Sequence, residues 1–508
     1  MAATLEAPPL DAPGPADAPK AGHAVAARLA RLRPLPDDRV LSWIATAVIT
    51  LVAAAVRLWG IGFPPDKQFD EVYYATEGVE MLRQGYESNR GYMFIVHPPL
   101  GKWLIAAGIK AFGDGPVGWR VPAAVAGTLC VLILIRVVRR MTRSTLLGCV
   151  AGVLLAADGL SIVQSRFALL DIFLAVFVLA GFACLVVDRD RVRERLAGAV
   201  GTGGVLGPRV GLRPWRLTGG VLLGLACAVK WSGIWFLLGF GLLSVLWDLG
   251  ARRSAAVPKP VGGTAARDLP GAVAALGVAP VAAYLLSWSG WFLGENAYGR
   301  HWADANAGYW SWLPGPLRSL LHYHWEMWHF HSTLTTPHDY QSSPWGWLVT
   351  GRPVLFYYPS KPPLTGCGAQ TCVRSVLAVG TPALWWAFAP AVLWAAWIAL
   401  VRRDWRGWAV LVAFGAGWLS WFSIPGRTMF LFYMTPLVPF LVIGVTLVLG
   451  AVLGTARAGE PRRTLGLAAV CAYVALVVVN SAYLWPILTG QLITYEEWRT
   501  RIWFPSWV

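Results

Sequence analysis

Residues 117–135 read Val-Gly-Trp-Arg-Val-Pro-Ala-Ala-Val-Ala-Gly-Thr-Leu-Cys-Val-Leu-Ile-Leu-Ile, and Arg136, Arg139, Arg140 and Arg143 follow at once. A mainly apolar stretch of this length can cross about 30 Å of hydrocarbon as a helix. Arginines directly after such a stretch are typical of the cytoplasmic end of a membrane span. Because the same unit recurs along the chain, the pattern predicts a helical membrane protein with a defined orientation.

The composition of the 508-residue chain agrees with this interpretation. Hydrophobic residues make up 56% and charged residues 14%, whereas an ordinary soluble domain carries about 25% charged residues. The mean hydropathy is +0.52. Seven cysteines are too few for a disulfide scaffold of this length. These values exclude a soluble enzyme and a disordered chain.

Eleven apolar stretches are expected to span the membrane as helices, which makes the fold class all-α and polytopic. They cover residues 41–58, 117–135, 144–160, 167–187, two segments within 217–249, 269–290, 382–400, 408–423, 429–449 and 465–487. Residues 1–40 are rich in Ala, Pro and Asp and predict a flexible tail. Two long polar loops are expected at 59–115 and 291–380.

The positive-inside rule then orients the chain. With the N-terminus in the cytoplasm, every short arginine-rich connection falls on the cytoplasmic side, while both long loops and the C-terminus fall outside. The net charge of +16 is therefore explained by orientation, and it does not indicate a nucleic-acid partner. No internal repeat is evident, which disfavours a lipid or solute transporter.

Ionisable residues gather at the predicted outer ends of the spans. They are Arg57, Asp70, Glu71, Lys102, Arg166, Asp171, Lys230 and Arg427. Ionisable groups near membrane depth are costly. Several cations beside one acidic pair therefore predict a site for an anionic ligand, such as a lipid phosphate, together with one proton to remove.

Structural explanations for single residues stay open. Asp70 and Glu71 could stabilise the N-terminus of an amphipathic helix over 71–84. Arg166 and Asp171 could form a structural ion pair. Lys230 could extend to the interface as many membrane lysines do, and Lys102 with Trp103 could anchor a loop at the headgroups.

The second long loop concentrates Trp and His, including the stretch His322–His331. Without a His-Glu-x-x-His pattern, alternating histidines are a weak metal signal, so an amphipathic segment in the membrane interface is the preferred interpretation. Cys367 and Cys372 are the only cysteines in a predicted outer loop. In an oxidising compartment they predict a local disulfide, although a reduced pair stays open.

Six segments occur in a characteristic order: FDEVYY at 69–74, HPPLGK at 97–102, SRFALLD at 165–171, AVKWSG at 228–233, HDYQSSPW at 338–345 and RTMFLFY at 427–433. This set resembles the protein O-mannosyltransferases, which are polyprenyl-phosphate-dependent membrane glycosyltransferases of the GT-C fold. Eukaryotic members carry a β-trefoil domain in the second long outer loop. The loop at 291–380 has no room for one, so the resemblance implies a bacterial member.

The resemblance implies that residues 41–508 form a membrane-embedded catalytic domain in the plasma membrane, with an extracytoplasmic active site. Mannose is expected to move from polyprenyl-phosphate-mannose to Ser or Thr hydroxyls of secreted proteins near the Sec translocon, with inversion at the anomeric carbon. By family likeness Asp70 is the base and Glu71 supports it. No general acid is expected, because the leaving group is already a stable phosphate. No metal and no cofactor are expected, because this lipid donor has no diphosphate for a divalent metal to neutralise.

Further roles are assigned by the same resemblance. Arg427 is the first candidate for the donor phosphate, with donor contacts also expected from Tyr433, Lys230, Lys102 and His338, and with Arg57, Arg166 and Asp171 bracing the Asp-Glu loop. Two rivals stay open. One is a transferase of the same fold that modifies a lipid or a cell-wall glycan, and the other is a lipid or solute transporter.

Overall fold

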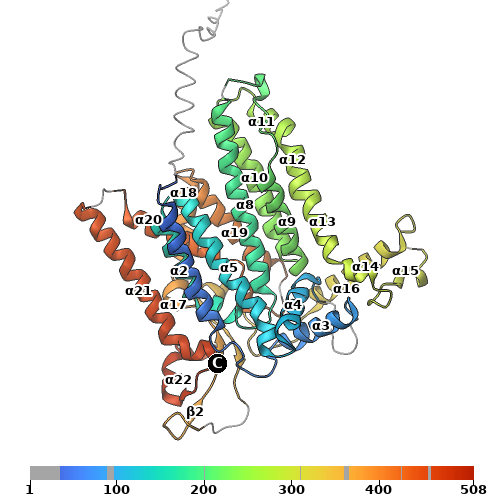
Figure 1. The fold of residues 1–508 in the computed structure, drawn as a ribbon, viewed down its shortest axis with the longest axis vertical. Helices are drawn as coiled ribbons and strands as arrows, with labels where there is room; N and C mark the ends of the chain where they lie inside the picture. Colours follow the sequence, from blue (N-terminus) through green and yellow to red (C-terminus); the bar gives the residue numbers. More distant parts are fainter. Residues whose placement is uncertain are drawn as a thin grey trace, which may run out of the picture.

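Long apolar helices form the body of the molecule in the computed structural model (Figure 1). The structure describes residues 35–88, 96–199, 201–308, 310–359, 365–424, 426–455 and 459–508. Most of the predicted tail at 1–40 therefore lies outside the described residues, and the first described helix begins at Arg39.

Within the described residues, seven helical segments are long and apolar enough to cross a membrane. They are α2 (Arg39–Leu58), α5 (Pro116–Thr142), α8 (Asp171–Gly198), α10 (Gly233–Ser254), the continuous run Pro260–Ser287, the pair α17 (Pro382–Trp385) and α18 (Phe388–Leu400), and α21 (Pro461–Thr489). The run Pro260–Ser287 contains α11 (Pro260–Gly263), α12 (Leu269–Val273) and α13 (Ala279–Ser287), joined by π-helical turns.

Shorter apolar helices complete the bundle: α6 (Thr145–Ala156), α9 (Pro214–Val229), α19 (Trp405–Gly417) and α20 (Val438–Leu453). Each of the eleven predicted spans therefore overlaps a described helix, and the prediction of a multi-pass helical membrane protein is confirmed. The number of helices that cross the membrane stays a prediction.

The helices differ in how much of their surface the protein covers. Of the most apolar stretch of α8, 78% is buried, against 17% for α2 and 28% for α21. A helix that is apolar on all sides but buried on few of them must face lipid. The structure thus has α8 at its centre, packed against α5, α9 and α10, with α2 and α21 at the periphery (Figure 1).

Three predicted spans contain breaks, and the breaks lie near the polar motifs. The span 144–160 divides at Asp158, whose carboxylate accepts from the amide of Ser161 at 2.8 Å and starts the short helix α7 (Gly159–Gln164). The span 167–187 becomes helical only at Asp171, and the α-helix of the span 429–449 begins only at Val438, after a 3-10 turn at Leu431–Met434. Irregular backbone at membrane depth is tolerated where protein surrounds it or where it lines a cavity.

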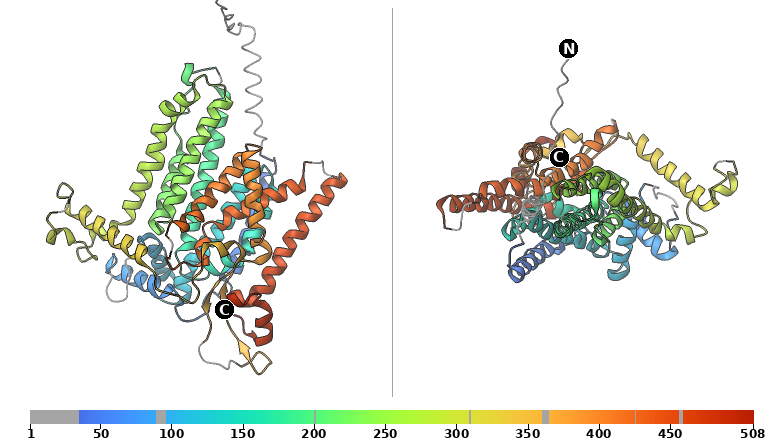
Figure 2. Two further views of the ribbon diagram at one scale, coloured as in Figure 1. Left: turned by 180° about the vertical axis from the view of Figure 1, so that it is seen from behind. Right: turned by 90° about the horizontal axis from the view of Figure 1, so that it is seen from above.

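The two long loops fold into short elements at one end of the bundle. The first loop contains α3 (Glu71–Gln84) and α4 (Leu100–Phe112). The second contains α14 (Ser289–Leu293), α15 (Trp302–Ala305) and α16 (Gly315–Thr333). Figure 2 shows α14–α16 projecting sideways from the bundle.

The expectation of an all-α fold needs a small correction, because the described residues include four short strands. β1 (Val354–Tyr357) pairs antiparallel with β3 (Val376–Ala378), and β2 (Cys372–Val373) pairs antiparallel with β4 (Ile493–Thr494). The second pair ties the long loop to the C-terminal helix α22 (Tyr495–Arg501), because Thr494 caps that helix reciprocally with Glu497.

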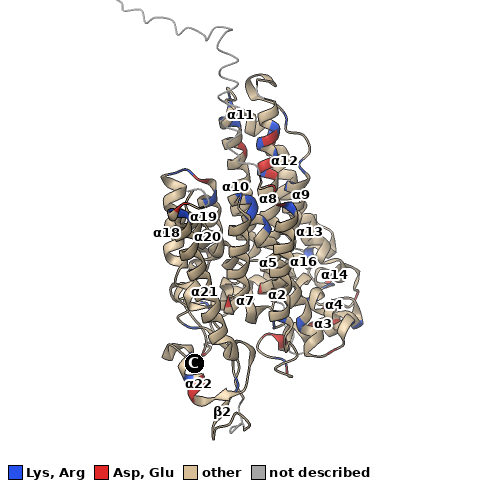
Figure 3. Ribbon diagram, turned by 60° about the vertical axis from the view of Figure 1, so that its left-hand side comes forward, with Lys and Arg blue, Asp and Glu red and all other residues tan. Residues whose placement is uncertain are grey.

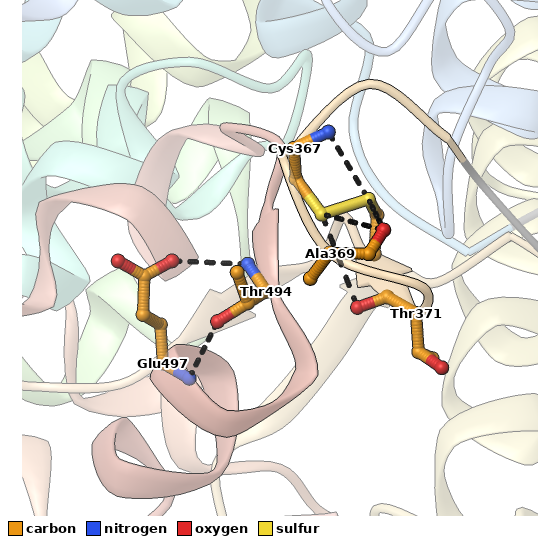
Figure 4. The surroundings of a disulfide bond; sticks show 6 residues. Cys367, Ala369, Thr371, Thr494 and Glu497 are labelled. Atoms are coloured by element: carbon orange, nitrogen blue, oxygen red, sulfur yellow. Dashed lines mark hydrogen bonds between the residues drawn. A yellow bond between two sulfur atoms is a disulfide. The ribbon is translucent and has the colours of Figure 1, made fainter.

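A disulfide joins Cys367 to Cys372, the first residue of β2 (Figure 4). The bond closes a tight hairpin, in which the amide of Cys367 also points to the Cys372 sulfur at 3.2 Å. Since Cys372 pairs with Thr494, the hairpin lies against the start of the C-terminal segment. Of the two states left open by the sequence, the structure has the oxidised one.

Charged residues distinguish the two ends of the bundle (Figure 3). Arginines and lysines concentrate at the end where α10 meets α11 and where α18 meets α19. The Asp-Glu motif lies at the other end, with α3, α4 and the strands. The six motif segments, which extend from residue 69 to residue 433, include the residues that lie around this second end.

Candidate active site

Asp70 lies at the N-terminus of α3. Its backbone carbonyl accepts from the amides of Tyr73 and Tyr74, at 3.0 and 3.1 Å, which begins the helix. Its half-buried carboxylate makes no side-chain cap. The Tyr74 hydroxyl instead donates to Oδ2 at 3.4 Å. Because capping does not occupy this carboxylate, it is available as a proton acceptor.

Glu71 is bonded on both carboxylate oxygens and fully buried. Arg120 donates from Nε to Oε1 and from Nη2 to Oε2, each at 2.8 Å. The amides of Ala168 and Gln68 donate to Oε1 at 2.8 Å and to Oε2 at 3.0 Å. A carboxylate with four such donors is fixed in place and joins three segments, so its position suits support of the neighbouring Asp70.

Arg120 was not among the residues singled out from the sequence. Besides Glu71, it donates to the carbonyls of Ile61 at 3.2 Å and Pro64 at 2.8 Å, and its guanidinium lies over the Phe167 ring. It therefore fixes the loop that leads to Asp70. The sequence did contain a signal for Arg120, because an arginine inside an apolar span such as 117–135 marks a structural or functional site.

Phe69 holds the backbone directly before the acidic pair. Its φ is +50°, a left-handed conformation that is uncommon for a residue with a large side chain. Its ring stacks on Phe356 and meets Phe430 and His338 edge-on, with centroids between 5.3 and 5.7 Å apart. This packing maintains the conformation that presents Asp70.

Asp171 and Lys230 form an ion pair beside Asp70. The ammonium of Lys230 lies 3.0 Å from Oδ1 and 2.9 Å from Oδ2 of Asp171. The same ammonium lies 5.2 Å from the centre of the Tyr433 ring. Asp171 is the first residue of α8 and Lys230 follows α9, so the breaks in these spans bring the two groups together.

The possible ion pair between Arg166 and Asp171 is therefore wrong. Arg166 instead donates to the carbonyls of Arg57 at 3.2 Å, Gly60 at 3.1 Å and Trp59. These carbonyls lie at the C-terminal end of α2 and in the two residues that follow it. Arg166 therefore holds the backbone at the start of the loop that leads to Asp70, while its part in supporting the reaction stays a prediction.

Arg57 also acts on the neighbouring turn rather than on the acidic pair. It donates to the hydroxyls of Ser165 at 3.2 Å and Ser161 at 3.0 Å. Gly127 makes this approach possible, since a Cβ there would lie 1.9 Å from the Ser165 hydroxyl. Arg57 therefore supports the segment that carries Arg166.

Lys102 is committed to a different cluster. Its buried ammonium lies 2.9 Å from a Glu77 oxygen and 2.5 Å from a Glu87 oxygen, and the hydroxyl of Tyr323 donates to Glu87 at 2.9 Å. Two carboxylates already neutralise this lysine, so it is not free to hold a phosphate. The expected donor contact from Lys102 is not supported by this geometry, and the cluster instead joins α3, α4 and α16.

Arg427 joins the segment before α20 to the end of α16. It donates from Nε to the His331 carbonyl at 3.1 Å and from Nη2 to His331 Nδ1 at 3.2 Å. Its Nη1 approaches the Tyr433 hydroxyl at 3.4 Å, and its guanidinium lies over the Trp421 ring. Within the described residues it has no carboxylate within 4.0 Å, so its charge is available to an anion.

His331 and His97 connect Arg427 with the Asp70 region. His331 Nε2 lies 2.6 Å from the Val96 carbonyl, so Nε2 carries the proton and Nδ1 accepts from Arg427. Burial and Arg427 lower the pKa of His331 to about 4. The His97 ring lies 5.1 Å from His331 and 6.1 Å from Tyr74 between centroids, and burial also lowers the pKa of His97.

His338 lies exposed at the edge of this cluster. Its Nδ1 accepts from the amide of Tyr340 at 3.1 Å, and its ring meets Phe430 edge-on with centroids 5.0 Å apart. It also touches Phe69, so it lies next to the Asp70 segment. Donor contact by His338 stays a prediction.

The surroundings of Asp70 tune its acidity. Burial raises the pKa of Asp70 to about 6, with Asp171 also raising it, while Lys230 and the Tyr74 hydrogen bond lower it. A carboxylate with a pKa in this range is ionised at neutral pH yet basic enough to accept a proton. In the part of the chain that the structure describes, no group of three or more His, Cys, Asp or Glu side chains could hold a metal ion.

Comparison with known families accounts for most of the chain. The model for dolichyl-phosphate-mannose-protein mannosyltransferase matches residues 47–122 and 110–260. The model for the C-terminal four-helix membrane region of protein O-mannosyltransferase matches residues 316–507. All six motif segments fall within these matched ranges.

Individual relatives match along nearly their whole length. The chain is 47% identical over 486 residues to polyprenol-phosphate-mannose–protein mannosyltransferases of Mycolicibacterium smegmatis and Mycobacterium tuberculosis, covering 93% of this chain and 94% and 93% of theirs. The Saccharomyces cerevisiae protein O-mannosyltransferase Pmt1-Pmt2 complex, solved with its sugar donor, matches with a TM-score of 0.73 at 16% identity, over 95% of this chain and 94% of that one. This last likeness concerns the fold.

Proposed function

The chain belongs to the protein O-mannosyltransferase family, and we propose that it transfers mannose from polyprenyl-phosphate-mannose to Ser or Thr hydroxyls of secreted proteins. The names of the mycobacterial relatives give this donor and a protein acceptor. Near-complete coverage of relatives at 47% identity supports carrying both to this chain.

In the proposed reaction, Asp70 accepts the proton of the acceptor hydroxyl. The hydroxyl oxygen attacks the anomeric carbon of mannose, and the bond from that carbon to the phosphate oxygen breaks. The polyprenyl phosphate leaves with the electron pair and needs no proton from an acid. Attack opposite the leaving group inverts the anomeric configuration.

Charge develops on the leaving phosphate, and Arg427 is the group best placed to stabilise it. It is half-buried, lacks a carboxylate partner among the described residues, and can present two N–H groups to two phosphate oxygens. Lys230 is a second candidate, although Asp171 already balances its charge. Tyr433 lies against both cations and could orient them toward the donor.

The single observation that carries the proposal is the contrast between the two neighbouring carboxylates. Glu71 is saturated by Arg120 and two backbone amides, whereas Asp70 receives a single weak hydrogen bond from Tyr74 within the described residues. One carboxylate is thus fixed and the other is free to react. The environment of Asp70 fits this role, because burial raises its pKa to about 6 even though the Lys230 cation acts to lower it.

We further propose eleven membrane spans, with a cytoplasmic N-terminus and with Asp70 and the C-terminus outside the plasma membrane, where acceptors leave the Sec translocon. The arginine-rich end of the bundle supports this orientation (Figure 3). Ser506→Cys should react with a membrane-impermeant maleimide on intact cells, and Arg253→Cys should react only after lysis, relative to the unmodified chain.

The activity is tested with purified protein, radiolabelled polyprenyl-phosphate-mannose and a Ser/Thr-rich peptide. Label should enter this peptide and not its Ala-substituted counterpart. Label that enters only lipid or cell-wall glycan acceptors would favour the rival transferase. Labelling should persist in excess EDTA, because the proposed reaction uses no metal; loss of activity that Mg²⁺ or Mn²⁺ restores would refute that part.

A further inference from the structure

A second site lies at the arginine-rich end of the bundle, remote from Asp70. A cavity of about 1000 Å³ opens between the ends of α5, α8, α18 and α20 and the starts of α6 and α19. Asp171 and Arg189 lie on α8, and 18 residues at 1.5 Å per residue place them about 27 Å apart. That separation is close to the thickness of the hydrocarbon layer, so the cavity lies near the opposite headgroup region.

Cations outnumber anions in the lining of this cavity. The arginines are Arg140, Arg143, Arg189, Arg402, Arg406 and Arg463, against two aspartates, Asp190 and Asp404. Asp190 is shared by three of them, at 2.9 Å from Arg140, 2.7 Å from Arg143 and 2.9 Å from Arg189. One carboxylate cannot neutralise three guanidinium groups, so positive charge remains.

Arg189 shows that this charge is not fully satisfied. Its side chain is 6% exposed, and its Nε has no hydrogen-bond partner among the described residues. The guanidinium stacks over the Trp405 ring at 3.8 Å, and Arg189 is one of the residues that line the cavity. A buried N–H of a charged group without a partner is costly and indicates a missing acceptor.

Two further arginines lack carboxylate partners within the described part of the chain. Arg402 is exposed and lies over the Trp397 ring at 4.6 Å. Among the described residues, the Arg463 side chain donates to the carbonyls of Leu453 and Gly454 at the end of α20. Both therefore retain donors for an anion at the mouth of the cavity.

The remaining lining separates a polar mouth from an apolar wall. Ser144 and Asp404 cap the N-termini of α6 and α19 at the cavity, which adds the partial positive charge of two helix ends. The wall is formed by apolar side chains of α6, α18 and α20, which are Leu147, Trp394, Ile398 and Leu447. A free phosphate would contact only the polar mouth of the cavity, whereas a phospholipid would contact the polar mouth and the apolar wall.

We propose that this cavity binds an anionic phospholipid, with its phosphate on the unpaired arginines and an acyl chain along the apolar wall. Basic pockets between membrane helices on the cytoplasmic side are suited to such headgroups. The site is separate from the donor site at the other end of α8, and it takes a lipid that the transfer reaction does not consume.

Native mass spectrometry of the full chain tests the proposal. Protein purified in detergent is mixed with equal amounts of phosphatidylglycerol, cardiolipin and phosphatidylcholine. Two variants perturb the cavity differently: the double change Arg402→Glu with Arg463→Glu reverses two charges, and Ala451→Trp fills the wall without altering charge. Arg253→Glu, an exposed arginine at the same end but outside the cavity, is the matched control.

The unmodified chain and Arg253→Glu should retain the anionic lipids over phosphatidylcholine, and the double variant should retain them at least about tenfold less well. Ala451→Trp should also lose lipid. Equal retention of all three lipids, or equal retention by the double variant, would overturn the proposal. Displacement of lipid by millimolar inorganic phosphate, with no effect of Ala451→Trp, would show a free-anion site instead. Unchanged melting temperatures exclude misfolding as the cause.

Discussion

Arg120 holds Glu71 by two parallel hydrogen bonds of 2.8 Å, so the residue next to the candidate base is fixed by an arginine from the following long helix. The same arginine binds the carbonyls of Ile61 and Pro64, which lead to Asp70. The two acidic residues therefore have different roles: Glu71 holds the loop in place, and Asp70 is free to react.

Asp70→Asn should lower transfer by about 10²–10⁴, because the change keeps the shape of the side chain and removes the base. The measurement is single-turnover transfer from polyprenyl-phosphate-mannose to a Ser/Thr peptide. Asp66→Asn, at an exposed position in the same loop, is the control and should transfer at the normal rate. Turnover of the purified Asp70→Asn protein at the control rate would remove Asp70 as the base.

Glu71→Gln should act mainly on stability. It leaves the Arg120 guanidinium buried without its counter-ion, and breaking such a pair typically costs about 3–5 kcal/mol. Activity at low temperature should fall less than in Asp70→Asn. A double-mutant cycle with Arg120→Gln, read from thermal melting in detergent, should show that the double variant loses less than the two single losses combined. Strict additivity would contradict the coupling.

Arg427→Ala should weaken use of the donor more than use of the acceptor peptide. Arg427→Lys should recover only part of the loss, because lysine keeps the charge but not the planar pair of donors. Donor and peptide titrations separate the two effects, and Arg83→Ala, an exposed arginine on α3, is the control. An unchanged donor KM and kcat in folded Arg427→Ala would make Lys230 the better candidate.

The pH dependence of transfer should report the pKa of Asp70, which lies at about 6. Asp70 must be ionised to accept a proton, so the rate should fall as the pH drops through about 6 and then by about tenfold per unit. Asp171 raises this pKa and Lys230 lowers it. Asp171→Asn should therefore move the acid limb to lower pH, whereas Asp66→Asn should leave it in place. A limb that moves upward in Asp171→Asn would refute this assignment.

Cys367 and Cys372 should be found bonded to each other in protein isolated without reductant. The closed loop is short, so the bond should contribute about 2 kcal/mol, and Cys367→Ser should lower the melting temperature modestly while leaving transfer intact. Peptide mapping by mass spectrometry, with thiols blocked during lysis, makes the measurement. Two blocked free thiols in fresh membranes would contradict the prediction.

The sequence alone determined the helical membrane class, the approximate span positions and the set of outer-end residues. Hydropathy is a local sum over some twenty residues, so Leu, Val and Ala in segments such as 117–135 specify a membrane helix without knowledge of any neighbour. The motif order identified the family by resemblance, and the family models matched the same regions. The Cys367–Cys372 bond was also predicted from the sequence, because these are the only cysteines in a predicted outer loop and they lie five residues apart.

Only the tertiary structure decided which charges meet. Arg166 and Asp171 are five residues apart, but the chain between them is not helical, so Asp171 meets Lys230 from 59 positions away. Lys102 likewise pairs with Glu77 and Glu87, and Glu71 pairs with Arg120, because the packing of separate segments brings these groups together. An ionic group buried near the membrane must be paired wherever the packing of separate helices brings a partner, and sequence spacing does not encode that proximity.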